Sequence, residues 1–360
     1  MYNKLYCVIM AGGKGERFWP QSREDRPKQL LNLLSPVSML EQTVARIQPL
    51  LPVENILILT NSSYVAAIRK LLPEIPADNI IGEPARRDTA PCVALAAGIV
   101  SAKSGNDPEA VMMLLPADHC IVNAAQFRAD LECAAKEAES TIVTIGIQPD
   151  SPSSDYGYIE CRAKTGKVSE VSRFVEKPSM ERAKEMLATD NYYWNAGMFI
   201  WQTGTIMKEF SRHAPQLAEF ARNTAANWNS NKFTDFLAEE FPRQEKISID
   251  YAILEKTDSI KVVRADFDWD DVGNWTSLRN HLQADEKGNI VSGNVKLLDC
   301  SNSIVLSDTP DELLTAVDQD NTIIIKSGNA TLVCKDTSGA KIKKLLAIVS
   351  KETDHPENYL

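Results

Sequence analysis

The chain has 360 residues, of which 44% are hydrophobic and 24% are charged, and its formal net charge is −10. This composition is typical of a globular protein that buries a large core, and the length exceeds one average domain. The acidic balance argues against a nucleic-acid-binding protein, which would need a broad basic face, although a local cationic loop can still hold a small anion.

Neither a leader segment nor a membrane span is predicted. The apolar stretch at residues 5–11 is too short for the core and cleavage site of a signal peptide, and no run approaches the ~18 apolar residues of a spanning helix. The seven cysteines are widely scattered without a C-x-x-C pair, which predicts free, mostly buried thiols rather than a zinc site or a disulfide framework. We therefore expect a cytoplasmic protein that does not bind membranes.

The first half of the chain alternates short apolar runs with helical patterns, which is typical of an α/β fold with a parallel sheet and right-handed crossovers. Ligands bind such sheets at the carboxyl ends of the strands, so the loop after the first strand is a candidate binding site. We predict buried strands at residues 5–10, 55–60, 110–116 and 141–147, and helices at residues 39–47, 63–72, 89–101 and 125–139.

From about Tyr156 the pattern changes. The closely spaced β-rich runs between residues 288 and 328, broken by Gly, Asn and Asp, indicate a small β-rich domain. Before them, we predict strands in YGYIE (156–160), VSEVSRFVEKP (168–178), AGMFIW (196–201) and SIKVVRADF (259–267), with helices at 180–188, at 205–211, within 215–254 and near 274–283.

The first predicted strand runs into a glycine-rich, cationic loop, AGGKGERFWPQSREDRPKQ. Gly12, Gly13 and Gly15 allow the backbone to turn sharply and approach a ligand, and their amides can bind phosphate oxygens. Arg17 and Lys28 add a guanidinium fork and a compact ammonium group. The loop lacks the Lys-Ser or Lys-Thr of a Walker A loop and has Phe where the dinucleotide fingerprint has Gly or Ala, which disfavours a nicotinamide oxidoreductase.

The pattern G-G-x-G-x-R-F-x-P followed by P-K-Q resembles the signature of the sugar-1-phosphate nucleotidylyltransferases. Together with further motifs, which follow in the order that this family shows over about residues 5–280, it is similar to the mannose-1-phosphate guanylyltransferases. These further motifs are GEPARRDTAP (82–91), LPADH (115–119), FVEKP (174–178), WNAGMF (194–199) and WDDVGNW (269–275).

The resemblance implies a Rossmann-like nucleotide-diphospho-sugar transferase domain with a mixed, mainly parallel sheet at residues 1–285, and a small β-rich, β-helix-like domain at residues 286–360. It also implies transfer of GMP from GTP to mannose 1-phosphate with the help of Mg²⁺, which yields GDP-mannose and pyrophosphate. GTP and mannose 1-phosphate are then the expected partners, and a homodimer is the expected assembly. Because the chain ends soon after the β-rich segment, we expect a single activity without an isomerase domain.

The resemblance also gives roles to the loop. Arg17 would hold the leaving end of the triphosphate, and Lys28 would bridge phosphate oxygens at the reacting centre; the alternative for either is a surface salt bridge. The nucleophile is already an anionic phosphate, so the reaction needs positioning and charge neutralisation rather than a protein nucleophile. The loop residues expected to bind the nucleotide are Ala11, Gly12, Gly13 and Gly15.

Two carboxylates are candidate ligands for Mg²⁺, a hard cation that prefers carboxylate and phosphate oxygens. Asp118 follows a buried strand, and its alternative role is to cap the next helix. Asp271 matches the second metal ligand of the family in D-V-G-x-W, although Asp268 and Asp270 stand too close for the sequence to exclude them. His119 is expected to be a structural neighbour, since Mg²⁺ prefers oxygen.

The motif EPARRDTAP supplies Glu83, Arg87 and Asp88, which the resemblance assigns to the nucleotide. Guanine offers N1–H and N2–H₂ donors that a carboxylate can accept, so a carboxylate here suits a guanine pocket. The alternatives are a rigid proline-bounded loop with an Arg–Asp ion pair, and a helix cap formed by Asp88.

A third group of residues would face the sugar phosphate, because hexose hydroxyls need both donors and acceptors. The alternatives are strand-end residues and a bulge glycine. Trp194, Phe199, Trp201 and Trp275 are expected to be packing residues, and Asp250 is a further candidate for contact. The sugar-phosphate-binding residues that the resemblance implies are Gly157, Glu176, Lys177, Asn195 and Gly197.

Other functions stay open at this stage. One is a nucleotidylyltransferase for another hexose 1-phosphate, or for dTTP or UTP. Another is a non-catalytic nucleotide-sugar-binding regulator, against which the joint presence of Arg17, Lys28, Asp118 and Asp271 argues, because binding alone would not require both metal carboxylates.

Overall fold

The computed structural model describes residues 4–163 and 166–360, which form two compact units. Each unit is assembled from segments that lie far apart in the sequence. The first consists of the described residues up to Gly12 with Val44–Ala117 and Ile121–Trp269; the second consists of Gly13–Thr43, Asp118–Cys120 and Asp270–Leu360. The division at residue 285 that the sequence suggested stays a prediction.

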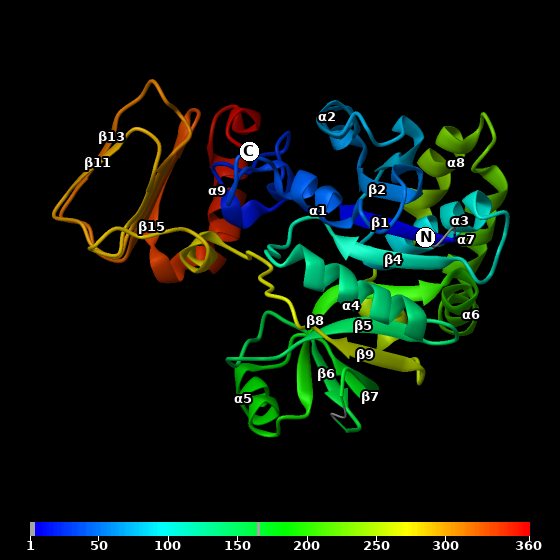
Figure 1. Ribbon diagram of the computed structural model, residues 1–360. Helices are drawn as coiled ribbons and strands as arrows, with labels where there is room; N and C mark the ends of the chain where they lie inside the picture. Colours follow the sequence, from blue (N-terminus) through cyan, green and yellow to red (C-terminus); the bar gives the residue numbers. More distant parts are fainter. Residues whose placement is uncertain (1–3, 164–165) are drawn as a thin grey trace. The chain divides into compact units, whose positions relative to one another are not determined.

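A mixed sheet forms the centre of the first unit (Figure 1). Among the described residues it has nine strands in the order β3-β2-β1-β4-β8-β5-β9-β7-β6. The neighbours from β3 to β4 are parallel, as are β5 and β9, whereas β8 is antiparallel to β4, β5 and β6. The strands are β1 (Leu5–Ala11), β2 (Ile56–Asn61), β3 (Ile80–Glu83), β4 (Val111–Pro116), β5 (Ile142–Ile147), β6 (Tyr158–Cys161), β7 (Val168–Val175), β8 (Tyr192–Gln202) and β9 (Ile260–Arg264).

The helices follow the predicted pattern closely, and those at residues 39–47 and 180–188 agree with the sequence to the residue. The predicted helix at 63–72 is shorter, because a 3₁₀ turn, Ser62–Tyr64, precedes it. The α-helices are α1 (Met39–Ile47), α2 (Val65–Leu71), α3 (Thr89–Lys103), α4 (Ala124–Glu137), α5 (Met180–Ala188), α6 (Thr203–His213), α7 (Pro215–Asn227), α8 (Phe233–Glu240) and α9 (Ile342–Glu352).

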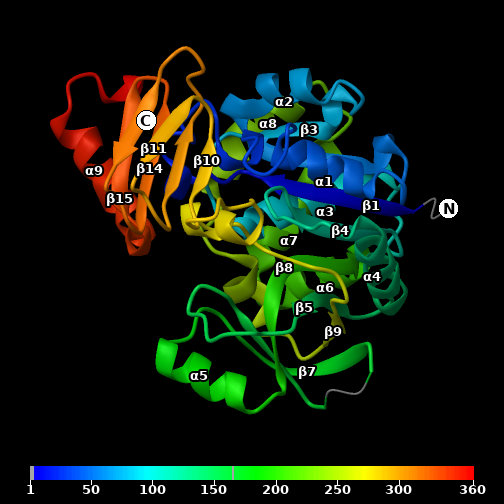
Figure 2. The same cartoon turned by 60° about the vertical axis from the view of Figure 1, so that its left-hand side comes forward.

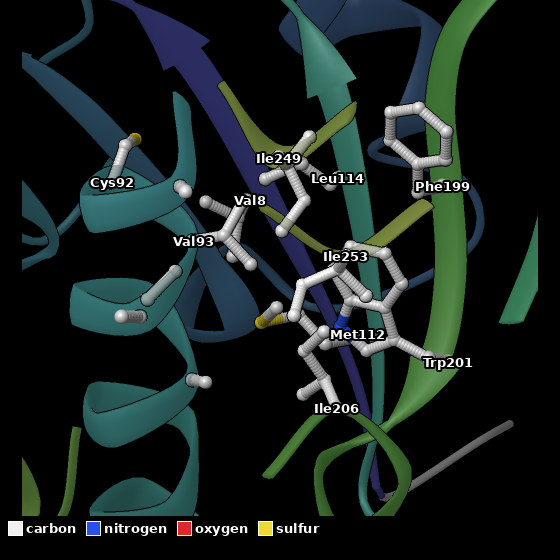
Figure 3. Packing of buried hydrophobic residues seen from close by; sticks show 14 of the residues in the cluster. Val8, Cys92, Val93, Met112, Leu114, Phe199, Trp201, Ile206, Ile249 and Ile253 are labelled. Carbon is white, nitrogen blue, oxygen red and sulfur yellow. The ribbon is translucent and has the colours of Figure 1, made fainter. Parts of the chain in front are cut away.

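The core of the first unit forms around α3, whose residues Ala90–Val100 are all buried (Figure 3). Val93 lies against Val8 of β1, and the large ring of Trp201 belongs to the same buried cluster. On its far side α3 contacts α7 so closely that a Cβ on Gly98 would lie 2.4 Å from the carbonyl oxygen of Ala221. A helix packed on both sides needs apolar residues all round, which explains its alanine-rich sequence.

Both faces of the parallel strands are covered. Tyr6 and Val8 of β1 belong to the core beside α3, whereas Cys7 and Ile9 alternate with them and are also completely buried. Successive side chains of a strand point to opposite faces, so this continuous apolar run is typical of a sheet buried on both sides.

The second unit is built on short parallel strands that stack in successive turns of the chain (Figure 2). Its larger sheet has the order β10-β12-β14-β15, in which only β15 is antiparallel to its neighbour, and β11 pairs in parallel with β13. This coiled arrangement gives the C-terminal region the expected β-rich character. The strands are β10 (Ile290–Ser292), β11 (Val295–Leu298), β12 (Ile304–Ser307), β13 (Leu314–Val317), β14 (Thr322–Ser327) and β15 (Ala330–Lys335).

One apolar cluster joins the glycine-rich segment to these strands. Phe18 and Leu31, from the segment after β1, share a buried cluster with Trp275, Ile304 and Ile323. The segment that carries the motif therefore has its hydrophobic anchor inside the second unit.

Two further features concern the chain as a whole. Within the described residues, no helix combines the length and the apolar character that crossing a membrane requires. The seven cysteines are free, and most of them are buried, as the sequence predicted.

Candidate active site

Gly15 fixes the shape of the glycine-rich loop. It begins a 3₁₀ turn, Glu16–Phe18, with φ 66° and ψ 32°, in the left-handed region that favours glycine. A Cβ on Gly15 would lie 2.2 Å from Cβ of Lys28, so the loop also needs glycine for space. The hydroxyl of Ser22 donates to the carbonyl of Gly15 at 2.7 Å and closes the turn. The loop thus brings its backbone directly against the segment that carries Lys28.

Lys28 is a buried cation rather than a member of a surface salt bridge. Its side chain is only 7% exposed, and its Nζ lies 2.9 Å from Oδ2 of Asp118. The same ammonium group donates to the carbonyl oxygen of Asp271 at 2.6 Å and lies 5.6 Å from the ring centre of Phe18. One lysine therefore connects both segments that were predicted to bind metal.

The two predicted metal-binding segments are also paired with each other. Cys120 and Asp270 exchange backbone hydrogen bonds, at 2.8 Å from the Cys120 amide and 3.1 Å from the Asp270 amide. Capping of the following helix by Asp118 was the alternative, but Asn123 fills that position by accepting from the Gln126 amide at 3.1 Å. The second unit thus holds Asp118 and Asp271 on adjacent segments.

Electrostatics favour an ionised Asp118. Burial alone would raise the pKa of this carboxyl, but the Lys28 ammonium, with a contribution from His119, outweighs burial and lowers the pKa below its ordinary value of 3.8. Asp118 therefore carries the negative charge that a divalent cation needs.

The hydrogen bonds separate the three neighbouring aspartates. Asp268 accepts from the backbone amides of Val122 and Asn123 at 2.7 and 2.8 Å. Asp270 contacts Nε2 of His281 at 2.9 Å and accepts from Asn280 at 3.0 Å, besides the amide of Val272. Both are occupied in holding the local structure.

Asp271 differs from these two neighbours in what it faces. Both of its carboxylate oxygens and a guanidinium nitrogen of Arg17 lie within 3.4 Å of the position that a Cβ on Gly273 would occupy. Asp271 therefore lies beside Arg17, and its role as a metal ligand, which the D-V-G-x-W register favours, stays a prediction.

Asp118 and Asp271 are the two candidate carboxylates for Mg²⁺. Across residues 4–163 and 166–360, no three or more histidine, cysteine, aspartate or glutamate side chains gather into a preformed cage. The Lys28 ammonium, itself a cation, is held between the carboxylate of Asp118 and the backbone of Asp271. Mg²⁺ is commonly bound by one or two carboxylates together with substrate phosphates, so these residues fit it.

Glu83 presents an unsatisfied acceptor in the first unit. It ends β3, and its Oε1 is buried without a hydrogen-bond partner. Burial raises the pKa of this carboxyl from 4.5 to about 7, partly offset by a hydrogen bond from Cys92. Its Oε2 lies 3.5 Å from the position that a Cβ on Gly12 would occupy, so the carboxyl lies beside the start of the glycine-rich loop. A buried acceptor without a partner is the kind of group that a ligand satisfies.

Arg87 and Asp88 have structural partners. The Asp88 carboxylate accepts from the Thr89 amide at 2.8 Å and caps α3, as one alternative reading of the sequence had it. The Arg87 guanidinium donates to the carbonyl of Pro242, while its Nε is buried without a partner. A nucleotide contact for either residue stays a prediction.

The predicted sugar-phosphate residues converge in the first unit. Oε1 of Glu176 lies 2.8 Å from Nζ of Lys177, and a Cβ on Gly157 would lie 2.5 Å from Oε2 of Glu176. The Asn195 amide donates to the Gly157 carbonyl at 2.8 Å, and the Gly197 amide donates to Oδ1 of Asn195 at 3.0 Å. The Glu176 carboxylate therefore lies in the space that a side chain at position 157 would occupy.

The aromatic residues of the motifs belong to the packing. Trp194, Phe199, Trp201 and Trp275 are each at most 6% exposed. The prediction that they are core residues rather than ligand platforms is confirmed.

Comparison with known proteins shows the family to which the chain belongs. A family model described as nucleotidyl transferase matches residues 6–288. The chain therefore belongs to the nucleotidyl transferase family, a family of enzymes that the sequence motifs already indicated.

Individual relatives show to which members of the family the chain is similar. The chain is 37% identical over 340 residues to a mannose-1-phosphate guanylyltransferase of Sinorhizobium fredii, covering 92% of this chain but only 65% of that protein. It is 36% identical over 356 residues to a mannose-1-phosphate guanylyltransferase of Klebsiella pneumoniae, covering 96% of this chain and 74% of that one. The chain thus spans about two thirds to three quarters of the length of these relatives.

A solved structure shows the same fold. The crystal structure of mannose-1-phosphate geranyltransferase from Thermus thermophilus superposes with a TM-score of 0.85 at 32% identity, over 96% of this chain and 99% of that chain. The mixed α/β fold and the β-rich C-terminal region are therefore shared with this relative over nearly the whole chain.

Proposed function

We propose that this protein transfers GMP from GTP to mannose 1-phosphate and releases GDP-mannose and pyrophosphate. The observation that carries the proposal is the buried Lys28 ammonium, bonded to the Asp118 carboxylate and to the backbone of Asp271. Its similarity to relatives named mannose-1-phosphate guanylyltransferases supports the choice of substrates.

In the proposed reaction, a phosphate oxygen of the sugar 1-phosphate attacks the α-phosphorus of GTP. A new P–O bond forms on one side, the bond to the β-phosphate oxygen breaks on the other, and its electron pair leaves with pyrophosphate. No protein group becomes covalently attached, so the residues contribute orientation and charge neutralisation. The amides of Gly12, Gly13 and Gly15 bind phosphate oxygens, with Ala11 leading the chain into the loop.

Arg17 and Lys28 bind different phosphates of the triphosphate. The Arg17 fork holds the leaving pyrophosphate, and the Lys28 ammonium neutralises charge at the α-phosphate. Asp118 and Asp271 would hold Mg²⁺, which would supply further positive charge to the phosphates. The approach of two polyanions is thereby made favourable.

Two groups of residues in the first unit, one around Glu83 and one around Glu176, select the substrates. Glu83 accepts from N1–H and N2–H₂ of guanine, which gives its buried Oε1 the partner that it lacks. Arg87 and Asp88 support the base from the start of α3. Glu176 and Asn195 bind hexose hydroxyls, while Lys177 binds the sugar phosphate and the Gly157 and Gly197 backbones approach it closely.

We also propose the remaining expectations from the sequence. The enzyme acts in the cytoplasm as a homodimer, with the catalytic domain at residues 1–285 and the small domain at residues 286–360.

A grid of GTP, ATP, dTTP and UTP against mannose, glucose and galactose 1-phosphates, with Mg²⁺ and read by pyrophosphate release, tests the proposal. We expect the GTP and mannose 1-phosphate combination to dominate. A maximum with dTTP or UTP would refute the assignment of the base, and a maximum with another hexose would refute that of the sugar. Binding of nucleotide sugars without turnover in any combination would instead identify a regulator.

A further inference from the structure

Asp250 lies beside the proposed sugar-phosphate site. It begins a π-helical turn, Asp250–Leu254, and the residue before it is fixed because the Ile249 amide donates to the Thr89 hydroxyl at 2.8 Å. Its Oδ1 lies 3.4 Å from the side-chain nitrogen of Asn195. Single π-helical turns often occur at functional sites, and this one brings a fourth segment of the chain to the site.

The orientation of Asn195 shows which group faces Asp250. The side-chain oxygen of Asn195 accepts from the Gly197 amide at 3.0 Å and from the Thr144 hydroxyl at 3.3 Å. The NH₂ group of Asn195 therefore points to the Asp250 carboxylate. At 3.4 Å this hydrogen bond is long, and it leaves the carboxylate with acceptor capacity.

The charges around Asp250 are not balanced. Glu176, with an 11% exposed side chain, is a second carboxylate in the same cluster, and the Lys177 ammonium pairs with Glu176 while remaining 62% exposed. Burial, followed by the neighbouring Glu176, raises the pKa of Asp250 from 3.8 to about 6, against the opposing effects of its own backbone amide, Lys177 and Ser248. Burial and the Glu176 charge thus outweigh the groups that stabilise the ionised Asp250 carboxylate.

We propose that Asp250 is a specificity-determining residue that accepts hydrogen bonds from hydroxyl groups of the bound hexose, next to Glu176. The inference rests on the proposed function, since it adds a residue to the same sugar-phosphate site. A hexose presents neighbouring hydroxyl donors, and Glu176 beside Gly157 and Asp250 beside Asn195 offer the matching acceptors. The sugar thereby supplies further donors to this carboxylate pair.

The substitution Asp250→Asn tests the role, because it keeps the size of the side chain and removes the charge. We expect the KM for the preferred hexose 1-phosphate to rise by about 10- to 100-fold, the range that one charged hydrogen bond represents. The KM for the nucleoside triphosphate should stay within about 2-fold of the wild-type value. The matched control is Asp258→Asn, at an exposed position a few residues after the π-helical turn. It should change neither the KM for the hexose 1-phosphate nor the KM for the nucleoside triphosphate.

A pH profile separates a direct contact from a structural effect. The charged and titratable groups that face Asp250 are Glu176 and Lys177, with Tyr251 next to Lys177. Since Asp250 is ionised only above about pH 6, binding of the hexose should weaken as the pH falls through that value. The sugar phosphate itself titrates near pH 6, so the same profile is measured with D250N, in which the contribution of the protein should be lost.

The outcomes are distinct. An unchanged KM for the hexose phosphate in D250N, with wild-type thermal stability, would overturn this inference. If D250N unfolds at a lower temperature than the wild type, a second variant, D250S, which replaces the charged side chain by a smaller neutral one, is used instead. Its affinity for the sugar phosphate is measured by calorimetric titration. An affinity equal to that of the wild type would overturn the inference as well. If the wild-type protein turns over no hexose 1-phosphate, the proposed function itself fails, whatever the variants do.

Discussion

Glu83 gives a prediction that connects stability with recognition of the base. In the folded chain its pKa is raised to about 7 from an ordinary value of 4.5, because burial disfavours the charged form. Between these two values the folded state keeps a proton that the unfolded state releases, so stability falls as the pH rises from about 4.5 to about 7. Replacing Glu83 by Gln removes the titration and should abolish this loss.

The size of the effect follows from the pKa. Each tenfold change in proton affinity corresponds to about 1.4 kcal/mol, so a rise from 4.5 to about 7 corresponds to about 3 kcal/mol. This figure is an upper bound, because the Glu83 side chain is partly exposed. At pH 8 the Glu83→Gln variant should therefore be more stable than the wild type by about 1–3 kcal/mol, whereas at pH 4 the two should be equal.

Urea denaturation at pH 4 and pH 8 measures the difference. The matched control is Glu139→Gln at an exposed position, which should leave the stability unchanged at both pH values. In the same preparations, discrimination of GTP against ATP should fall by at least about 10-fold in Glu83→Gln, since the amide replaces one of the two acceptor oxygens of the carboxylate by a donor NH₂ group. If the variant is no more stable than the wild type at pH 8, the argument from burial is wrong.

Three further predictions concern the second unit. Lys28→Met should lower kcat/KM by at least about 100-fold in the pyrophosphate assay, and a loss below about 10-fold would show that Lys28 does not touch the reacting phosphates. Gly15→Ala should unfold at a lower temperature than the control variant Gly105→Ala. Both glycines have a positive φ, but only at Gly15 would an added Cβ clash with Lys28, and equal melting temperatures would contradict this prediction. The pKa of Asp118 is lower in the folded chain than in the unfolded chain, so its stabilising contribution is present above about pH 4 and is lost as the pH falls further. Acid unfolding of Asp118→Asn should therefore depend less on pH than that of the wild type. Identical unfolding profiles would rule out the ion pair between Asp118 and Lys28.

Much of the fold can be predicted from the sequence because the periodic signal is strong. Buried strands such as Val111–Pro116 are continuous apolar runs, and the helix Met180–Ala188 has a clear amphipathic spacing with a serine cap at Ser179. The strand Ile80–Glu83 was missed, since only two of its four residues are apolar and it ends in Gly-Glu. A short edge strand of this kind is recognisable only from its pairing with β2.

The candidate site divides in the same way. Residue types and order pointed to the loop and to the carboxylates, and the D-V-G-x-W register favoured Asp271. The sequence alone could not exclude Asp268 and Asp270, because their hydrogen-bond partners lie far away along the chain. Asp270 is held by His281, and Asp268 by the amides that precede α4. The same limit applies to Asp250, whose neighbour Asn195 lies in another segment of the fold.

The glycine-rich loop motif contains apolar residues that pack rather than bind phosphate. Phe18 packs edge-on against Trp275 with ring centres 5.0 Å apart, and the Trp275 indole donates to the Trp19 carbonyl at 3.2 Å. Lys28 lies over the same Phe18 ring. Since Trp275 belongs to the motif that carries Asp271, one aromatic contact fixes the cationic segment to the carboxylate segment. In the proposed site this small aromatic core fixes the positions of the charged residues, so the aromatic residues of both motifs support the site without contacting the substrate.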